Sequence, residues 1–257
     1  MNVLGGIDAL AVDDGPAFVV VGVFDGLHLG HRYLLERLVA ESSGRGAKPV
    51  VITFDHHPDE VLTGLAPPLL LDPQERLERL AAAGVEVTVV QHFDAALRQT
   101  PYDVFIQRIA SRLVLTGFLM TPDAAFGFER RGTPEAVRDL GARDGFDVVV
   151  MPPLMLAGRP VRSMEIRRAI AAGDLDTARE LLGRQLTLTG AIDLDGQLRF
   201  ALPMAMPPDG RYAVDLLGVV RTLEIRDRVA YVPGQPPTER AVIGFVSSRS
   251  GAVRAAG

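Results

Sequence analysis

Strand-sized apolar runs alternate with helical patterns through the first two-thirds of the chain, and this alternation limits the fold more than any other feature. Five runs rich in β-branched residues stand out: Ala17–Phe24, Val50–Phe54, Val85–Val90, Leu113–Thr121 and Phe146–Met151. Continuous apolarity is typical of strands in a parallel sheet that is covered on both faces. The sequence therefore predicts an α/β fold with a Rossmann-like, doubly wound parallel sheet and right-handed crossovers.

Helix starts can be read between these runs, because a capping residue directly before a proline marks a helix N-terminus. Three such pairs are Asp72-Pro73, Thr100-Pro101 and Thr133-Pro134. Two further helical patterns cover Glu165–Ala172 and, after the cap candidate Asp174, Leu175–Leu182.

The pattern changes at Gly183, after which six short β-like stretches follow one another. Turn dipeptides separate several of them: Asp195-Gly196, Asp209-Gly210 and Pro233-Gly234. This pattern predicts a small antiparallel β-barrel or sandwich. We therefore expect two domains, one over residues 1–183 and one over residues 184–257.

Composition narrows the classes of function. The 257 residues include no cysteine, which excludes disulfides, thiolate metal sites and a cysteine nucleophile. Of the 27 cationic residues only Lys48 is a lysine, and the net charge of −5 disfavours a nucleic-acid surface. The apolar runs are too short to span a membrane, and the N-terminus lacks the basic start and long apolar stretch of a signal peptide. We expect a cytoplasmic protein.

The segment Gly22–His31 is the strongest functional candidate. It follows the first strand and leads directly into a helix, which is where open α/β sheets bind ligands. Backbone N–H groups and the helix dipole favour an anion there, and glycines allow its close approach. His28 and His31 are three residues apart and can face the same ligand. The segment predicts a polyphosphate site in which imidazoles take the place of lysine.

Two other interpretations of these histidines remain open. A histidine beside a turn can be purely structural. The pair could instead bind zinc, which needs a third ligand that Asp25 could supply, but the chain has no HExxH pattern. We predict no protein ligand for a metal ion.

At this point the sequence resembles a known family. His28-Leu29-Gly30-His31 matches the HxGH signature of the nucleotidylyltransferase superfamily, and Phe24-Asp25-Gly26 before it resembles the bacterial FAD synthetases. Three later segments follow in the family's order: Thr53–Pro58 (TFDPHP-like), Phe126-Gly127 (DFxFG-like) and Arg162–Arg167 (SSTxIR-like). The resemblance covers about residues 15 to 183.

The resemblance implies transfer of an adenylyl group from ATP to FMN, which gives FAD and pyrophosphate, with Mg²⁺ arriving with ATP. It implies catalytic roles at the α- to γ-phosphates for His28, His31 and Arg167. The ATP-binding residues it implies are Gly22, Val23, Phe24, Asp25, Gly30, Arg162 and Ser163. The flavin-binding residues it implies are Phe54, His57, Pro58, Asp123 and Phe126. Phe54 could instead be only a core residue, and His56, where the family has proline, is expected at the surface.

The chain also departs from the family pattern. Ala124 and Ala125 replace an aromatic and a polar residue in the Phe126 loop, while Arg162 and Met164 replace hydroxyl residues. The stretch Gln197–Ala205 has no PTAN-like threonine and asparagine pair, so we expect a reduced riboflavin-kinase-like domain without kinase activity.

Two alternative functions remain: transfer to another phosphorylated substrate, or a non-catalytic nucleotide- or flavin-binding paralogue. Small nucleotides and flavin are the expected partners, with neither nucleic acid nor membrane. The exposed barrel surface leaves room for a homo-oligomer.

Overall fold

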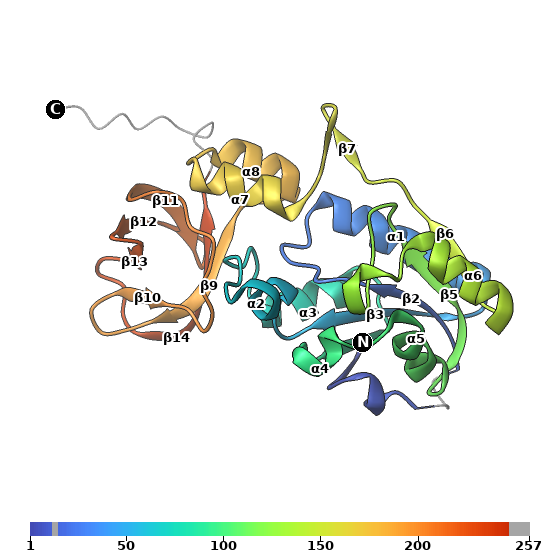
Figure 1. Cartoon of the computed structure of the whole chain (residues 1–257). Coiled ribbons are helices and arrows are strands. Elements are labelled where there is room, and N and C mark those ends of the chain that lie inside the picture. Colours follow the sequence, from blue (N-terminus) through green and yellow to red (C-terminus); the bar gives the residue numbers. More distant parts are fainter. Residues whose placement is uncertain (12–14, 247–257) are drawn as a thin grey trace. The chain divides into compact units, whose positions relative to one another are not determined.

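A computed structural model describes residues 1–11 and 15–246 of the chain (Figure 1). Contacts divide it into two compact units, and we treat each by itself. The sheet unit contains Met1–Phe24, Gly30–Pro67 and Arg76–Pro160. The barrel unit contains Asp25–Leu29, Pro68–Glu75 and the chain from Val161 onward.

The sheet unit is built on six strands in the order β1-β4-β3-β2-β5-β6, and every neighbouring pair is parallel. The strands are β1 (Asn2–Leu4), β2 (Pro16–Val21), β3 (Lys48–Phe54), β4 (Val87–Gln91), β5 (Val114–Met120) and β6 (Asp147–Val150). All five predicted strands are present, which confirms the parallel sheet. The short edge strand β1 was not predicted.

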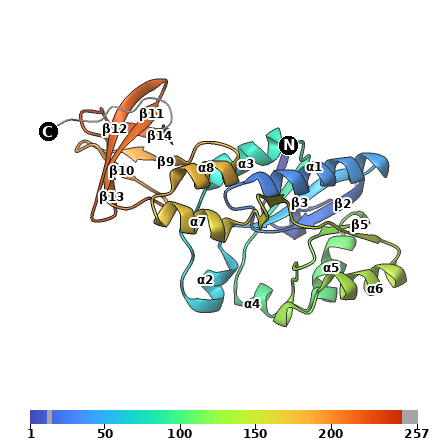
Figure 2. The ribbon, with the colours of Figure 1, turned by 90° about the horizontal axis from the view of Figure 1, so that it is seen from above.

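Helices cover both faces of this sheet, as a doubly wound fold requires. Figure 2 shows α1 on one face and α5 and α6 on the other. The helices and short segments up to β6 are η1 (Ile7–Ala9), α1 (Leu29–Gly44), α2 (Pro58–Thr63), α3 (Pro73–Ala82), α4 (Ala95–Arg98), α5 (Tyr102–Ala110), η3 (Phe128–Arg130) and α6 (Pro134–Asp144). A small hairpin of β7 (Met155–Leu156) and β8 (Arg159–Pro160) ends the unit.

The helix caps follow the predicted pairs with one exception. Asp72 accepts hydrogen bonds from the N–H groups of Gln74 (3.0 Å) and Glu75 (3.2 Å), and Thr133 accepts from Ala136 (3.3 Å). The prediction for Thr100 is wrong. Its hydroxyl donates backward to the carbonyl of Ala96 in α4 (3.0 Å), and Pro101 occupies the N-cap position of α5.

The core of the sheet unit lies on the central strands. Phe18, Val19, Ile52 and Phe118 have no measurable solvent exposure. Burying each such side chain contributes about 1.5–3 kcal/mol to folding, so these strands hold the carboxyl edge of the sheet in a fixed position. The functional segment after β2 starts from this rigid edge.

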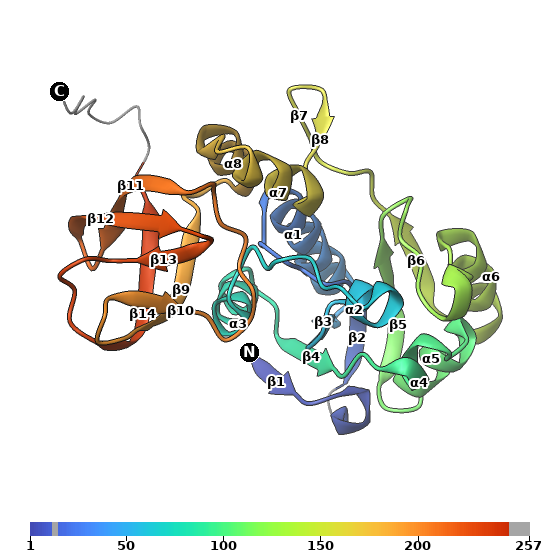
Figure 3. The same cartoon turned by 60° about the vertical axis from the view of Figure 1, so that its left-hand side comes forward.

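The barrel unit contains a closed six-stranded barrel in the order β10-β13-β12-β11-β14-β9, and all of its pairs are antiparallel (Figure 3). Its strands are β9 (Thr187–Ile192), β10 (Gln197–Arg199), β11 (Gly210–Leu216), β12 (Val219–Arg226), β13 (Val229–Tyr231) and β14 (Thr238–Phe245). Inward-facing Leu188, Val214, Leu223 and Ile243 are buried. The predicted β domain is therefore confirmed as a barrel.

Two helices precede the barrel and group with it by contact: α7 (Ser163–Ala171) and α8 (Leu175–Leu182). Asp174 caps α8 by accepting from the N–H of Thr177 (3.0 Å). The predicted domain boundary at Gly183 stays a prediction. None of the helices in the described part of the chain is long and apolar enough to cross a membrane.

Candidate anion-binding site

The segment Gly22–His31 forms a tight turn between β2 and α1. Three of four successive positions have a positive φ, in or near the left-handed region: Phe24 (φ 53°), Gly26 (φ 84°) and Leu27 (φ 37°). A Cβ on Gly26 would lie 3.0 Å from side-chain atoms of Leu70, so this position requires glycine. Gly22–Phe24, Gly30 and His31 belong to the sheet unit, and Asp25–Leu29 belong to the barrel unit.

In the sheet unit, hydrogen bonds from side chains stabilise the start of this turn. The carbonyl of Val23 accepts from the hydroxyl of Thr53 (3.0 Å) and from Nη1 of Arg76 (3.2 Å). Nη2 of Arg76 donates to the carbonyl of Phe54 (2.9 Å), and the N–H of Gly22 donates to Ile52 (3.0 Å). Arg76 is almost fully buried and ties the ends of β2 and β3 together. Sequence reasoning missed it, because a single arginine within a helical pattern carries no motif.

Phe24 and His31 lie together in the same unit. The Phe24 side chain is buried, and its ring centroid is 5.2 Å from that of His31. His31 and Gly30 are in the first turn of α1, where backbone N–H groups have no partner within the helix. This turn therefore offers an imidazole and N–H donors to an anion.

In the barrel unit, Asp25 is the centre of a hydrogen-bond network. Its carboxylate is 3% exposed and accepts from the N–H of Leu70 at 2.9 and 3.1 Å. It also forms an ion pair with Arg167, whose Nε donates to the carbonyl of Pro68 (2.8 Å). The hydroxyl of Ser163 donates to the backbone carbonyl of Asp25 (3.0 Å). Asp25 thus fixes the orientation of the Arg167 guanidinium at the start of α7.

His28 is buried in this network. Burial first, and then the charges of Arg167 and Arg184, lower the pKa of His28 to about 4. At neutral pH the imidazole is uncharged in the absence of ligand. Nη2 of Arg184 donates to the carbonyl of Gly26 (2.9 Å), which places this arginine at the same turn. Sequence reasoning missed Arg184, because it stands just after the expected domain boundary and belongs to no motif.

The network in the barrel unit is suited to an anion. The charges of Arg167 and Arg184 both act on the buried imidazole of His28, and Arg167 is paired with Asp25. Ser163 begins α7, where N–H groups and the helix dipole add to that field. Arg162 precedes α7 with an exposed side chain that does not cap the helix, and Met164 is also exposed. A polyphosphate matches this donor set.

The predicted flavin residues after β3 have local structural partners. Phe54 is buried and packs edge-on against Phe93, with ring centroids 5.2 Å apart. Nδ1 of His57 accepts from the N–H of Asp59 (3.2 Å), so His57 caps α2, and Pro58 is the first residue of that helix. These contacts fix the segment in place, and a flavin role for it stays a prediction.

The Phe126 loop lies at the carboxyl end of β5. The ring centroids of Phe105 and Phe118 are 5.7 and 6.0 Å from that of Phe126. Asp123 accepts from the hydroxyl of Thr121 (2.8 Å) within the same loop. A cavity of about 40 Å³ is lined by Phe126, Ala124 and residues of β2, α1 and β5. This volume is far below the roughly 300–1,000 Å³ of a typical small-molecule pocket, so the cavity as it stands does not hold a flavin ring.

Asp25, the carboxylate of the anion network, is not available to coordinate a magnesium ion directly. Both oxygens of Asp25 accept hydrogen bonds from Leu70, and one is paired with Arg167. Mg²⁺ keeps much of its water shell and binds readily to phosphate oxygens. The ion therefore fits this chain as part of a magnesium–nucleotide substrate.

A doubly wound parallel sheet with an HxGH turn at its carboxyl edge defines a nucleotidylyltransferase-type α/β protein. A model of the FAD synthetase family matches residues 11–165. The chain belongs to the FAD synthetase family, as its motifs suggested.

Curated relatives of known name agree with this assignment. A bifunctional riboflavin kinase/FMN adenylyltransferase of Escherichia coli (strain K12) is 30% identical over 213 residues, which covers 78% of this chain and 68% of the relative. The protein of the same name from Pseudomonas fluorescens is 29% identical over 223 residues, covering 85% and 71%. A crystal structure described as a macrolide-efflux protein from Streptococcus pneumoniae has a TM-score of 0.79 at 23% identity, covering 95% of this chain and 96% of that one, and it shows the fold alone.

Proposed function

We propose that this chain is an FMN adenylyltransferase. An oxygen of the FMN phosphate attacks the α-phosphorus of ATP, the bond from that phosphorus to the bridging oxygen of the β-phosphate breaks, and FAD and pyrophosphate form. The observation that carries the proposal is the anion network at the family's HxGH turn, where buried His28 lies in the field of Arg167 and Arg184. Family membership supports the same reaction.

Little covalent chemistry is needed for this transfer. The attacking phosphate oxygen is already ionised at neutral pH, so no side chain has to remove a proton from it. The protein has to align the two phosphates and stabilise the charge that develops on the α-phosphate and the leaving pyrophosphate. We assign the α-phosphate contacts to His28 and His31, and the β- and γ-phosphate contacts to Arg167 with Ser163 and Arg162.

The remaining ATP-binding groups act through the backbone of the turn. Gly22, Val23, Phe24 and Gly30 hold the chain where an anion can approach the N–H groups of α1. Asp25 is a positioning residue, because it contacts Arg167 and Leu70. Magnesium enters with ATP and neutralises phosphate charge.

The flavin side is assigned to Phe54, His57, Pro58, Asp123 and Phe126. Aromatic and apolar surfaces suit a flat ring system. A cavity of about 40 Å³ lies beside Phe126, and we expect it to widen when the flavin binds. Ala124 leaves space there that an aromatic side chain would fill.

We assign residues 1–183 to adenylyl transfer and residues 184–257 to a reduced riboflavin-kinase-like barrel without kinase activity. The stretch that lacks the nucleotide-loop motif instead pairs with Leu69, which donates to the carbonyl of Pro203 (2.8 Å) and accepts from the N–H of Ala205 (2.8 Å). Leu69 precedes Leu70, whose N–H holds Asp25. These bonds support a structural role for the barrel, in which it stabilises the segment that holds Asp25.

We expect a cytoplasmic location and no binding to nucleic acid, and we leave open whether the chain forms homo-oligomers.

The experiment is incubation with ATP, Mg²⁺ and FMN, with chromatographic detection of FAD and an assay for pyrophosphate. Removing one preorganised donor lowers kcat by about 10²–10³ in comparable sites, so His28→Gln should reduce FAD formation by roughly that factor. Arg167→Gln should also lower the rate, whereas Arg168→Gln, its exposed neighbour on α7, is the matched control and should keep it.

The alternatives have distinct outcomes in the same experiment. Pyrophosphate release only with a different phosphorylated acceptor would assign another nucleotidylyltransferase activity, which the altered Phe126 loop motivates. Binding of ATP without turnover of any acceptor would assign a non-catalytic paralogue, which Met164, Ala124 and Ala125 motivate.

A further inference from the structure

A cluster of two imidazoles and a carboxylate lies at the ends of β3 and β4, and the proposed adenylyl transfer does not use it. Asp55 and His56 directly follow β3, and His92 directly follows β4. Among the residues that the structure describes, potential ligand atoms of these three side chains all lie within 4.8 Å of one another. We propose that Asp55, His56 and His92 bind a divalent transition-metal ion of the Zn²⁺ type.

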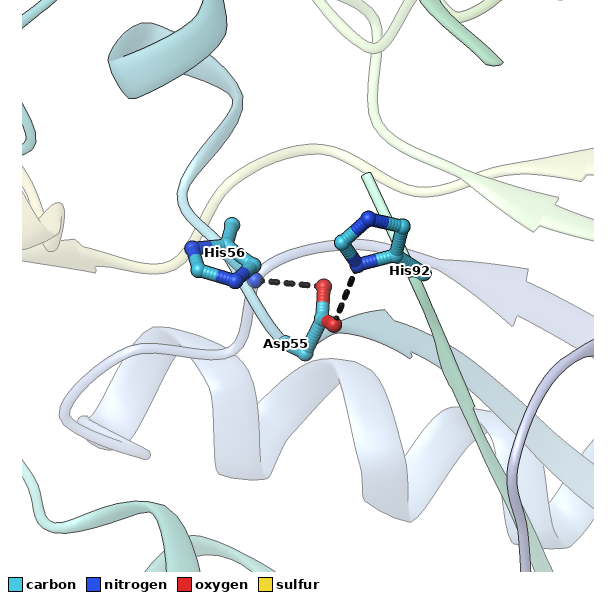
Figure 4. Close-up of side chains that lie close together, drawn as sticks. All are labelled: Asp55, His56 and His92. Carbon is cyan, nitrogen blue, oxygen red and sulfur yellow. Dashed lines mark hydrogen bonds and ion pairs between the residues drawn. The ribbon is translucent and has the colours of Figure 1, made fainter. Parts of the chain in front are cut away.

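The carboxylate of Asp55 is held in place by the backbone. Its Oδ1 accepts from the N–H groups of His56 (2.7 Å) and Phe93 (3.1 Å). The Asp55 N–H donates to the carbonyl of Gln91 (3.3 Å), which joins the ends of the two strands. Because Oδ1 is fixed in this way, Oδ2 faces His92, whose Nδ1 is 2.7 Å away. Figure 4 shows the carboxylate between the two histidine rings.

Metal-binding histidines commonly donate their other ring N–H to a carboxylate, and Glu60 can accept this hydrogen bond from His56. Nδ1 of His56 lies 3.1 Å from Oε2 of Glu60 in α2. A proton on Nδ1 that is donated to Glu60 leaves the lone pair of Nε2 for an ion, which is the usual arrangement of a carboxylate, a histidine and a metal. The rings of His56 and His92 are 5.6 Å apart and nearly perpendicular, with an interplanar angle of 81°.

The donor set selects the kind of ion. Two imidazole nitrogens and one carboxylate oxygen suit Zn²⁺ and similar ions, whereas Mg²⁺ and Ca²⁺ prefer sites made of oxygen alone. All three side chains are solvent-exposed, so an ion can reach them without opening the fold. Three protein ligands leave at least one coordination position open to water or a small ligand.

The test is a titration of the full chain with Zn²⁺ in competition with a chromophoric chelator. We expect one ion per chain, and Co²⁺ in its place should give the intense visible bands of a low-coordinate site. His56→Ala and His92→Ala should each weaken Zn²⁺ binding at least about tenfold. Glu60→Gln removes the carboxylate that contacts His56 but is not itself a proposed ligand, and it should weaken Zn²⁺ binding about tenfold.

His31→Gln is the matched control, because it also removes an imidazole from the sheet unit but lies outside the cluster. It should keep the Zn²⁺ affinity. Thermal unfolding without metal shows that each variant is folded, and the high exposure of His92 makes a folding defect unexpected there. Failure of the unaltered chain to bind Zn²⁺ would overturn the proposal. Unchanged affinity in the His56→Ala/His92→Ala double variant would overturn it as well.

Discussion

At the scale of single residues, the proposed phosphate chemistry rests on a histidine that the fold keeps neutral. Burial and two arginines act in the same direction on the pKa of His28. A neutral imidazole donates one hydrogen bond without repelling Arg167 and Arg184. A bound polyphosphate supplies negative charge at the same place, so it should raise the pKa again. The same residues that depress the pKa thus prepare the site for an anion.

This pKa makes folding stability depend on pH. Above pH 6.5 His28 is neutral in both the folded and the unfolded chain. Between pH 6.5 and about 4 only the unfolded chain is protonated at this residue, so the free energy of unfolding falls as the pH is lowered. The loss is complete below about pH 4 and amounts to roughly 3 kcal/mol. Urea titrations across this range should show a smaller loss in His28→Gln. An equal pH dependence in both proteins would contradict the assignment.

The pair formed by Asp25 and Arg167 should contribute strongly to stability. Asp25→Asn removes the charge that faces a largely buried guanidinium and should lower the free energy of unfolding by about 3 kcal/mol. Glu165→Gln is the control, because it breaks a pair with Arg168 on the same helix at the surface and should cost less than about 1 kcal/mol. Chemical denaturation measures both. Equal costs would show that the Asp25 pair has no special role.

The residues that sequence reasoning found and missed differ in one physical respect. His28 and His31 lie in one short motif and Ser163 lies in another, and each motif is confined to a few consecutive residues at the start of a helix. Arg76 and Arg184 reach the same turn from distant parts of the chain. No local pattern encodes such long-range contacts, so only the folded structure shows them.

At the scale of elements, apolar runs predicted the five longer strands of the sheet because buried parallel strands need continuous apolarity. β1 escaped prediction because its three residues are too short to show a pattern. The barrel strands were predicted from turn signals and alternation, but closure into a barrel rather than a sandwich depends on the pairing of β9 with both β10 and β14.

Two of the threonine–proline pairs, at Thr100 and Thr133, give a prediction at this scale. Thr133→Ala removes a hydroxyl that accepts from a backbone N–H of α6 and should lower the free energy of unfolding by about 1 kcal/mol. Thr100→Ala, at an identical dipeptide, removes no cap and should cost less than about 0.5 kcal/mol. Thermal or urea unfolding separates the two. A larger cost at Thr100 would contradict the cap assignment.

At the scale of the whole molecule, the chain combines a nucleotidylyltransferase-type sheet unit with a closed barrel, and it belongs to a family whose named relatives are bifunctional. The barrel fold alone does not supply kinase chemistry, because function depends on the site and not on the fold. Here the stretch that lacks the nucleotide-loop motif is hydrogen-bonded to Leu69.

We therefore predict that the chain does not phosphorylate riboflavin. Incubation with riboflavin, ATP and Mg²⁺ should leave riboflavin unchanged, with no FMN detected by chromatography. A known bifunctional relative, such as the Escherichia coli protein, is the positive control. FMN formation by this chain would show that the barrel uses a different nucleotide-binding loop.

The most direct test of the central claim is the stoichiometry of adenylyl transfer. The chain is mixed with FMN, ATP and Mg²⁺, and FAD and pyrophosphate are measured in the same sample. We predict that the two products appear in equal amounts, and that His28→Gln slows both to the same extent. Absence of FAD under conditions where the chain binds ATP would contradict the claim.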